Sequence, residues 1–191
     1  MKKLLKRRIA LYLMTAVTLL TGSVVTQADP LVGAGLAIGQ HAPAFLLTDQ
    51  SGTNVSLATL LKQGPVALVF VRSASWCSVC KLRVLQLQRN LKAIEASGGH
   101  LAGISFDSAE AIKKFADREK VAFPMLSDAG SKTIDAYGMR NQESGDGSAI
   151  HGIIIIDQNA IVRSKVFLTS REDSEVVAEL TSALKAASSV K

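Results

Sequence analysis

Three short runs of mostly apolar residues constrain most strongly what this chain can fold into. They are VALVFV at 66–71, HLAGIS at 100–105 and GIIIID at 152–157. A continuous apolar run of this length is typical of a strand that is buried on both faces of a sheet. Segments with the apolar spacing of helices lie between these runs, and such an alternation predicts an α/β domain with helices packed on a central sheet.

The neighbouring segments complete this prediction. AFLLT and NVSLA flank the turn sequence DQSGT, which indicates a hairpin, and IVRSKVFL is expected to pair antiparallel with the strand at 152–157. A final helix is expected to start at Ser170, and Asp107 is expected to cap the helix after 100–105, with Glu110 completing a capping box. We therefore predict a mixed sheet flanked by helices, in a single domain at 41–188 after a flexible, Gly-rich lead-in at 29–40.

The first 28 residues have the three-part build of a secretory signal peptide. MKKLLKRR carries five cations and no acid, IALYLMTAVTLL is apolar apart from two threonines, and TGSVVTQA ends in small residues. We predict that 1–28 is a signal peptide and that the mature protein is periplasmic or otherwise exported. The alternative is an uncleaved membrane anchor, because the apolar stretch 9–25 reaches the lower limit of about 17 residues for a membrane span.

The basic character of the chain comes mostly from this segment. The net charge of the whole chain is +6, but without 1–28 it is +1, since 17 cations then face 16 acids. A protein that binds nucleic acid through charge needs a basic surface on its folded domain. We therefore expect no nucleic-acid partner, and contact with a membrane only through an uncleaved N-terminal segment.

The chain has two cysteines, Cys77 and Cys80, in the stretch SASWCSVCKLR. Disulfides persist outside the cytosol, but a bridge across two intervening residues closes too short a loop to restrict the unfolded chain much. The pair is therefore better suited to a bond that opens and closes than to a structural bond. It follows the strand at 66–71 directly, at the sheet edge where open α/β sheets bind ligands.

The position of each cysteine predicts a different role. Cys80 starts an apolar helical stripe that continues through Val84 and Leu87 to Ile94, so it should be buried, whereas Cys77 precedes the first helical turn and should be accessible. Unpaired N–H groups and the helix dipole stabilise a thiolate there. An exposed attacking sulfur with a sheltered resolving sulfur is what thiol–disulfide exchange needs.

The charges around the cysteines favour the same chemistry. Residues 50–94 contain six Lys and Arg, among them Arg72, Lys81 and Arg83, and no Asp or Glu. We expect these cations to hold the pKa of Cys77 below the free-thiol value of about 8.5. The alternative is that they point into solvent and that acids from other parts of the chain fold over them.

The motif and its surroundings resemble a known family. A strand, then ASWCSVC, then an amphipathic helix is similar to the active-site segment of the thioredoxin superfamily. GQHAPAFLLTDQSGTNVSLATLL, VALVFVRSASWC, GISFDSAEAIKKFADREKVAFPMLSDAGSKTIDAYGMR and GIIIID resemble in order its peroxiredoxin-like branch, the alkyl hydroperoxide reductase and thiol-specific antioxidant family, or redoxins. The resemblance covers about Gly39 to Phe167 and implies a thioredoxin-like fold.

The sequence departs from that family at two places. Peroxiredoxins have a Pro-x-x-x-Thr-x-x-Cys pattern, and ending it on Cys80 puts Ser73 in place of the proline and Cys77 in place of the threonine. Thioredoxins have a cis-proline just before the strand that here is GIIIID, where this chain has His151. The alignment implies that His151 faces the cysteines, where it could stabilise the thiolate as a cation or transfer a proton.

These observations predict an exported thiol–disulfide oxidoreductase with antioxidant activity, in which Cys77 attacks and Cys80 resolves to leave a Cys77–Cys80 disulfide. Trp76 is expected to cover the disulfide, and Arg72, Lys81 and His151 to support it. The expected partners are protein thiols and disulfides or a small peroxide, with a separate reductant or oxidant protein, and neither a cofactor nor a metal is expected. The alternatives are a thiol peroxidase, a copper-binding protein that uses Cys77, Cys80 and His151, and a binding protein with an idle disulfide.

Overall fold

The computed structural model describes residues 33–168 and 172–190. The predicted signal peptide and Ser170 lie outside these residues. Within them, no helix combines the length and the apolar character that crossing a membrane requires.

The centre of the domain is a seven-stranded mixed sheet with the strand order β2-β1-β5-β4-β3-β6-β7. The strands are β1 (Leu46–Asp49), β2 (Asn54–Ser56), β3 (Val66–Val71), β4 (His100–Ser105), β5 (Met125–Ser127), β6 (Gly152–Ile156) and β7 (Val162–Phe167). β3, β4 and β5 are parallel to one another, whereas β6 pairs antiparallel with both β3 and β7. β1 and β2 form the predicted hairpin.

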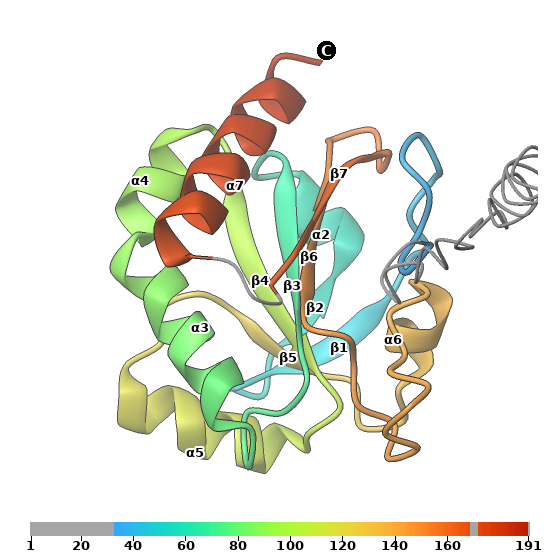
Figure 1. Cartoon of the computed structure of the whole chain (residues 1–191), viewed down its shortest axis with the longest axis vertical. Helices are drawn as coiled ribbons and strands as arrows, with labels where there is room; N and C mark the ends of the chain where they lie inside the picture. The colour runs from blue at the N-terminus through green and yellow to red at the C-terminus, as the bar shows by residue number, and fades with distance from the viewer. Residues whose placement is uncertain (1–32, 169–171, 191) are drawn as a thin grey trace, which may run out of the picture.

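Helices cover both faces of the sheet (Figure 1). They are α2 (Leu57–Leu61), α3 (Ser78–Arg89), α4 (Leu91–Ala96), α5 (Ala109–Glu119), α6 (Lys132–Ala136) and α7 (Asp173–Ser188). α3, α4, α5 and α7 pack on one face, and α2 and α6 pack on the other. The predicted fold, a mixed sheet flanked by helices, is confirmed.

The position of β3 in the sheet explains why its sequence is apolar throughout. All six of its residues are fully buried. Ala67, Val69 and Val71 belong to the core under α3, α4, α5 and α7, whereas Val66, Leu68 and Phe70 belong to the core under α2 and α6. Successive side chains of a strand point to opposite faces, so a strand between two helical layers has no polar face.

Two predicted segments differ from the structure. The apolar stripe from Cys80 to Ile94 belongs to two helices, because Asn90 interrupts the helical geometry and its side-chain amide donates to the Gln86 carbonyl. Residues 33–40, expected to be flexible, are attached to the domain: Leu36 is buried, and the N–H groups of Gly35 and Gly39 donate to Gly138 and Val162.

The strand directions bring four chain segments to one edge of the sheet. The carboxyl ends of the parallel strands β3, β4 and β5 lie along this edge. The amino end of the antiparallel strand β6 lies there too, since Gly152 pairs with Phe70. The residues that follow β3 and β4 and those that precede β6 are therefore neighbours in space, although up to 80 residues separate them in the chain.

Candidate functional site

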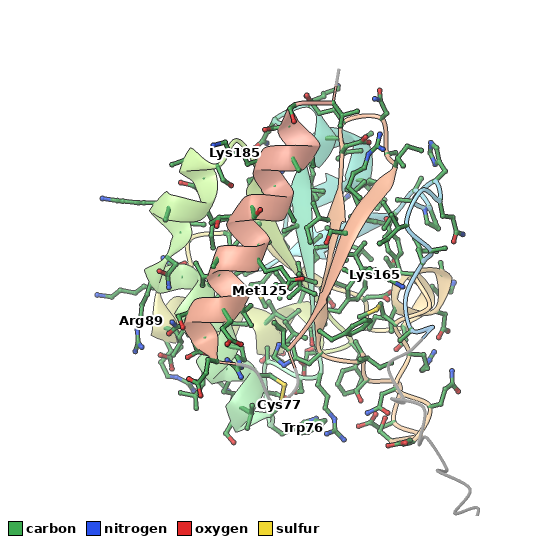
Figure 2. All side chains as sticks on the ribbon, turned by 45° about the horizontal axis from the view of Figure 1, so that its top comes forward. Trp76, Cys77, Arg89, Met125, Lys165 and Lys185 are labelled. Carbon is green, nitrogen blue, oxygen red and sulfur yellow. A yellow bond between two sulfur atoms is a disulfide. The ribbon has the colours of Figure 1, made fainter. Side chains whose placement is uncertain are left out.

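Cys77 and Cys80 form a disulfide at the amino end of α3, with their Cα atoms 5.3 Å apart (Figure 2). Cys77 is the N-cap of α3 and has an extended backbone, and Cys80 lies in the first helical turn. The Cys80 N–H donates to the Cys77 sulfur over 3.3 Å. The helix therefore directs one of its unpaired N–H groups at this sulfur.

The two sulfurs differ in accessibility, as the helical spacing predicts. Cys80 is 2% exposed and packs in the core with Val84 and Leu87. Cys77 is partly exposed at the edge of the same core. A molecule that approaches the disulfide from solvent reaches the Cys77 sulfur first.

The loop between β3 and α3 is anchored to a buried carboxylate that follows β4. Asp107 accepts hydrogen bonds from the Ser73 and Ser75 hydroxyls, at 3.0 and 2.7 Å, and from the Ala74 N–H at 2.6 Å. The Ser105 hydroxyl is a fourth donor.

The predicted capping role of Asp107 is wrong, because Ser108 caps α5 by accepting from the Ala111 N–H.

Ser73 extends this network toward the cysteines. Its hydroxyl is fully buried and accepts from the N–H groups of Ser75 and Trp76, at 3.0 and 3.2 Å. Each polar group named in this loop thus has a partner, which buried polar groups require. This role of Asp107 was not predicted, although Ser73 and Asp107 each lie two residues after the end of one of the adjacent parallel strands β3 and β4.

The predicted supporting cations lie around the loop, but each already has a contact. The Lys81 ammonium donates to the Ser75 carbonyl over 2.5 Å, and the Arg72 guanidinium lies 5.3 Å from the centre of the Trp76 ring. Arg83 forms a salt bridge with Asp173 of α7. For Arg83 the alternative expectation is therefore correct: an acid from a distant part of the chain, Asp173, pairs with this cation. Trp76 is half exposed and contacts Arg72 on one ring face.

His151 precedes β6 at the same sheet edge. Its Nε2 atom is buried and has no hydrogen-bond partner among the described residues. Burial and, to a lesser extent, the positive charge of Arg83 lower the pKa of His151 to about 4. The ring is therefore neutral at neutral pH while the Cys77–Cys80 disulfide is intact.

Residues 33–168 and 172–190 contain no group of three or more His, Cys, Asp or Glu side chains that could hold a metal ion. Cys77 and Cys80 bond to each other instead. The donor set of the copper alternative, two thiolates and His151, is therefore not assembled in this structure.

The fold and the site define a class: a thioredoxin-like α/β domain with a Cys-x-x-Cys disulfide where its central strand meets a helix. The model of the AhpC/TSA family matches residues 38–165. The chain therefore belongs to the AhpC/TSA family, as the sequence resemblance predicts.

Individual relatives agree with this assignment. A putative peroxiredoxin of Mycobacterium tuberculosis is 32% identical over 119 residues, which are 62% of this chain and 74% of that protein. The crystal structure of peroxidoxin BcpB from the same organism shares the fold, with a TM-score of 0.72 and 24% identity over 79% of this chain and 97% of that one. The solution structure of a putative protein disulfide isomerase from Bacteroides thetaiotaomicron has a TM-score of 0.63 and 27% identity, over 80% and 94% of the two chains.

Family membership and the Cys77–Cys80 disulfide together make this protein an enzyme, a thiol oxidoreductase or a thiol peroxidase. The family also indicates peroxides and thiol reductants as its classes of partner.

Proposed function

We propose that the mature protein is an exported thiol–disulfide oxidoreductase, with Cys77 as the attacking cysteine and Cys80 as the resolving one. The observation that carries this proposal is the unequal exposure of two bonded cysteines at the amino end of α3. An accessible sulfur next to a buried one favours attack by the first and resolution by the second.

In the reduced protein the Cys77 thiolate attacks one sulfur of a partner's disulfide, and the partner's other sulfur leaves as a thiolate. The Cys80 thiol then loses its proton and attacks the Cys77 sulfur, which releases the partner's second thiolate. Two electrons pass to the partner, whose two thiolates take up the proton of Cys80 and one proton from water, and the Cys77–Cys80 disulfide remains. The Cys80 N–H and the adjacent helix end support the negative charge on Cys77 before the attack.

The anchored loop supports this mechanism. Asp107 holds Ser73, Ala74 and Ser75, which directly precede Trp76 and Cys77. The loop can therefore keep Cys77 in place while its bond to Cys80 opens and closes. His151, which is neutral beside the disulfide, lies at the same edge and is suited to accept or return a proton.

A Cys80→Ser variant tests the assignment of roles. The variant should accumulate a mixed disulfide through Cys77 when mixed with a disulfide-containing protein such as insulin, because no resolving sulfur remains. The matched control is Cys77→Ser, which should capture nothing. Covalent capture by Cys77→Ser that equals that of Cys80→Ser would contradict the assignment.

The second candidate is a thiol peroxidase, which the family and its relatives named as peroxiredoxins favour. A peroxide would oxidise one thiolate to a sulfenic acid and leave as water or an alcohol, and the other cysteine would condense with it to release water. Against this, the Ser73 hydroxyl that replaces the family's proline is committed to the loop network. Peroxide consumption at the rate of insulin reduction or faster would favour the peroxidase.

Export is proposed from the sequence of residues 1–28 alone. Expression of the full chain in a Gram-negative host should release a periplasmic protein whose first residue is Asp29. Recovery of the uncleaved chain in the membrane fraction would favour the anchored alternative, and recovery in the cytosol would contradict export.

A further inference from the structure

We propose that a pocket beside the Cys77 loop binds the carboxylate groups of small acidic disulfides, which makes such disulfides the preferred substrates of the Cys77–Cys80 pair. This inference rests on the proposed oxidoreductase function and names a substrate class for it. It uses residues of α5 that the mechanism itself does not need.

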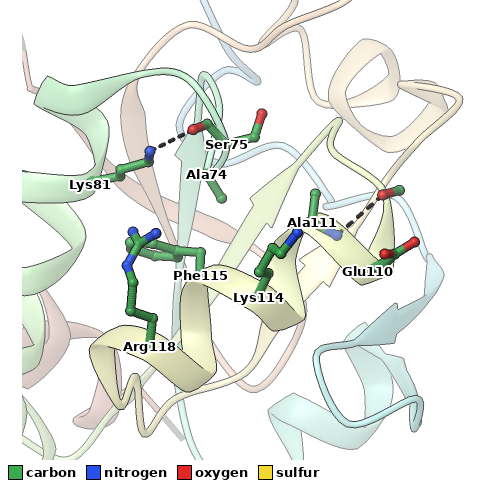
Figure 3. A pocket seen from close by; sticks show the side chains of 9 residues that line it. Ala74, Ser75, Lys81, Glu110, Ala111, Lys114, Phe115 and Arg118 are labelled. Carbon is green, nitrogen blue, oxygen red and sulfur yellow. Dashed lines mark hydrogen bonds between the residues drawn. The ribbon is translucent and has the colours of Figure 1, made fainter.

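The pocket lies between α3, α5 and the loop that follows β3 (Figure 3). Its volume of about 380 Å³ is near the lower end of the range of about 300–1,000 Å³ for small-molecule sites. Its lining residues are Ala74, Ser75, Lys81, Ser108, Glu110, Ala111, Lys114, Phe115 and Arg118.

The charge of the lining favours an anion. Lys81, Lys114 and Arg118 line the pocket, and Glu110 is the one acid among the lining residues. Lys114 and Arg118 are four residues apart in α5 and therefore lie on one face of the helix. Arg118 forms an ion pair with Glu119 through its Nε atom, so this ion pair occupies only one edge of the guanidinium group.

The lining also accommodates an aliphatic portion of a ligand. Ala74, Ala111 and Phe115 are the apolar members of the lining, and Ala111 is the most exposed of them, since Ala74 and Phe115 are 1% and 3% exposed. A carboxylate on a short carbon chain matches this combination better than a bare inorganic ion or an apolar molecule. A small peptide or an amino-acid derivative has such groups.

The pocket is close enough to the disulfide for one molecule to reach both. Ser75 lines the pocket and precedes Cys77 by two residues, so their Cα atoms are at most about 8 Å apart. Lys81 lies one helical turn after Cys77, and its ammonium contacts the Ser75 carbonyl (Figure 3). A disulfide whose sulfur is at Cys77 can therefore place a carboxylate a few bonds away in the pocket.

The experiment compares three small disulfides that differ in charge: glutathione disulfide is anionic, 2-hydroxyethyl disulfide is neutral and cystamine is cationic. Each is mixed with the reduced mature protein, which becomes oxidised as the disulfide becomes two thiols. The fluorescence of Trp76, the one tryptophan in the chain, reports the oxidation of the adjacent Cys77. Each rate is divided by the rate at which the same disulfide reacts with mercaptoethanol, which removes differences in intrinsic reactivity.

At low ionic strength we expect glutathione disulfide to react roughly tenfold faster than 2-hydroxyethyl disulfide, and cystamine to react most slowly, since several charge pairs act over about 8 Å. The preference should decrease in 1 M salt, where the screening length is about 3 Å. The double variant Lys114→Gln, Arg118→Gln should lose most of it. The matched control Arg89→Gln, Lys92→Gln removes the same charge from exposed positions outside the pocket and should retain the preference.

The outcomes separate the two proposals. If none of the three disulfides oxidises Cys77, the proposed oxidoreductase function fails. If all three react with equal normalised rates, the oxidoreductase function stands but the pocket does not select anionic disulfides. If the control variant loses the preference as fully as the pocket variant, the function stands and the preference does not come from the pocket.

Discussion

The two sides of the active-site loop differ in the burial and the hydrogen bonding of their side chains. On the inner side, Ser73 and Asp107 are 0% and 7% exposed and form a closed network of hydrogen bonds. On the outer side, Trp76, Val79 and Leu82 are large apolar side chains with 50%, 61% and 65% exposure. The fold therefore fixes the backbone before Cys77 through buried hydrogen bonds and leaves the surface around Cys77 exposed to solvent.

The largest effect is expected from removing the centre of the inner network. Asp107→Ala leaves the hydroxyls of Ser73, Ser75 and Ser105 and the Ala74 N–H without their acceptor. Since unsatisfied buried donors each cost about 1–3 kcal/mol, the free energy of unfolding should fall by about 4 kcal/mol. Urea unfolding of the oxidised protein measures this.

Asp107→Asn is the matched control for that variant. The amide retains one acceptor oxygen and nearly the same shape, so the free energy of unfolding should fall by only about half as much. A loss below about 1 kcal/mol for Asp107→Ala would mean that the inner network does not hold the loop.

The burial of His151 can be tested through the pH dependence of stability. Burial and Arg83 lower the pKa of His151 to about 4 in the folded protein, below the value of about 6.5 for an unfolded chain. The unfolded chain therefore binds more protons between these values, so the contribution of His151 is complete above about pH 6.5 and is lost as pH falls toward 4. It amounts to at most about 3 kcal/mol.

The measurement is urea unfolding between pH 4 and 7 of the wild type and of His151→Gln. The wild type should lose more stability across this range than the variant, because the variant cannot titrate at this position. Equal pH slopes for the two proteins would show that His151 is not held neutral by burial. An NMR titration of the ring gives the pKa directly.

The smallest effect is expected on the outer side. Val79→Gln and Leu82→Gln replace exposed residues of α3 with a good helix former, so each should change the free energy of unfolding by less than about 0.5 kcal/mol. Thermal unfolding checks this. A loss above about 1 kcal/mol would mean that these side chains support the fold and that the contrast between the two sides is incorrect.

The sequence predicts most of the fold because its elements follow from local patterns. β3, β4 and β6 are apolar runs since both faces of the sheet are covered, and Cys80, Val84 and Leu87 mark the buried side of α3. The predicted burial of Cys80 is a consequence of the same periodicity. The break at Asn90 was missed because the apolar stripe continues across it.

The site is less predictable because its contacts are not local. Asp107 fits a local capping pattern, and only the adjacency of β3 and β4 makes it the acceptor for a loop more than 30 residues earlier. The neutral state of His151 depends on how deeply the ring is buried, and the salt bridge of Arg83 depends on where α7 packs. Neither property has a pattern in the sequence.

The central claim is that Cys77 is the reactive thiolate and Cys80 its sheltered partner. The most direct measurement is alkylation of the reduced protein with iodoacetamide across a pH series, with the label at each cysteine quantified by peptide mass spectrometry. We predict that Cys77 is labelled much faster than Cys80 and that its rate follows a pKa below about 8.5. Equal labelling of the two cysteines, or a Cys77 pKa at or above that value, would contradict it.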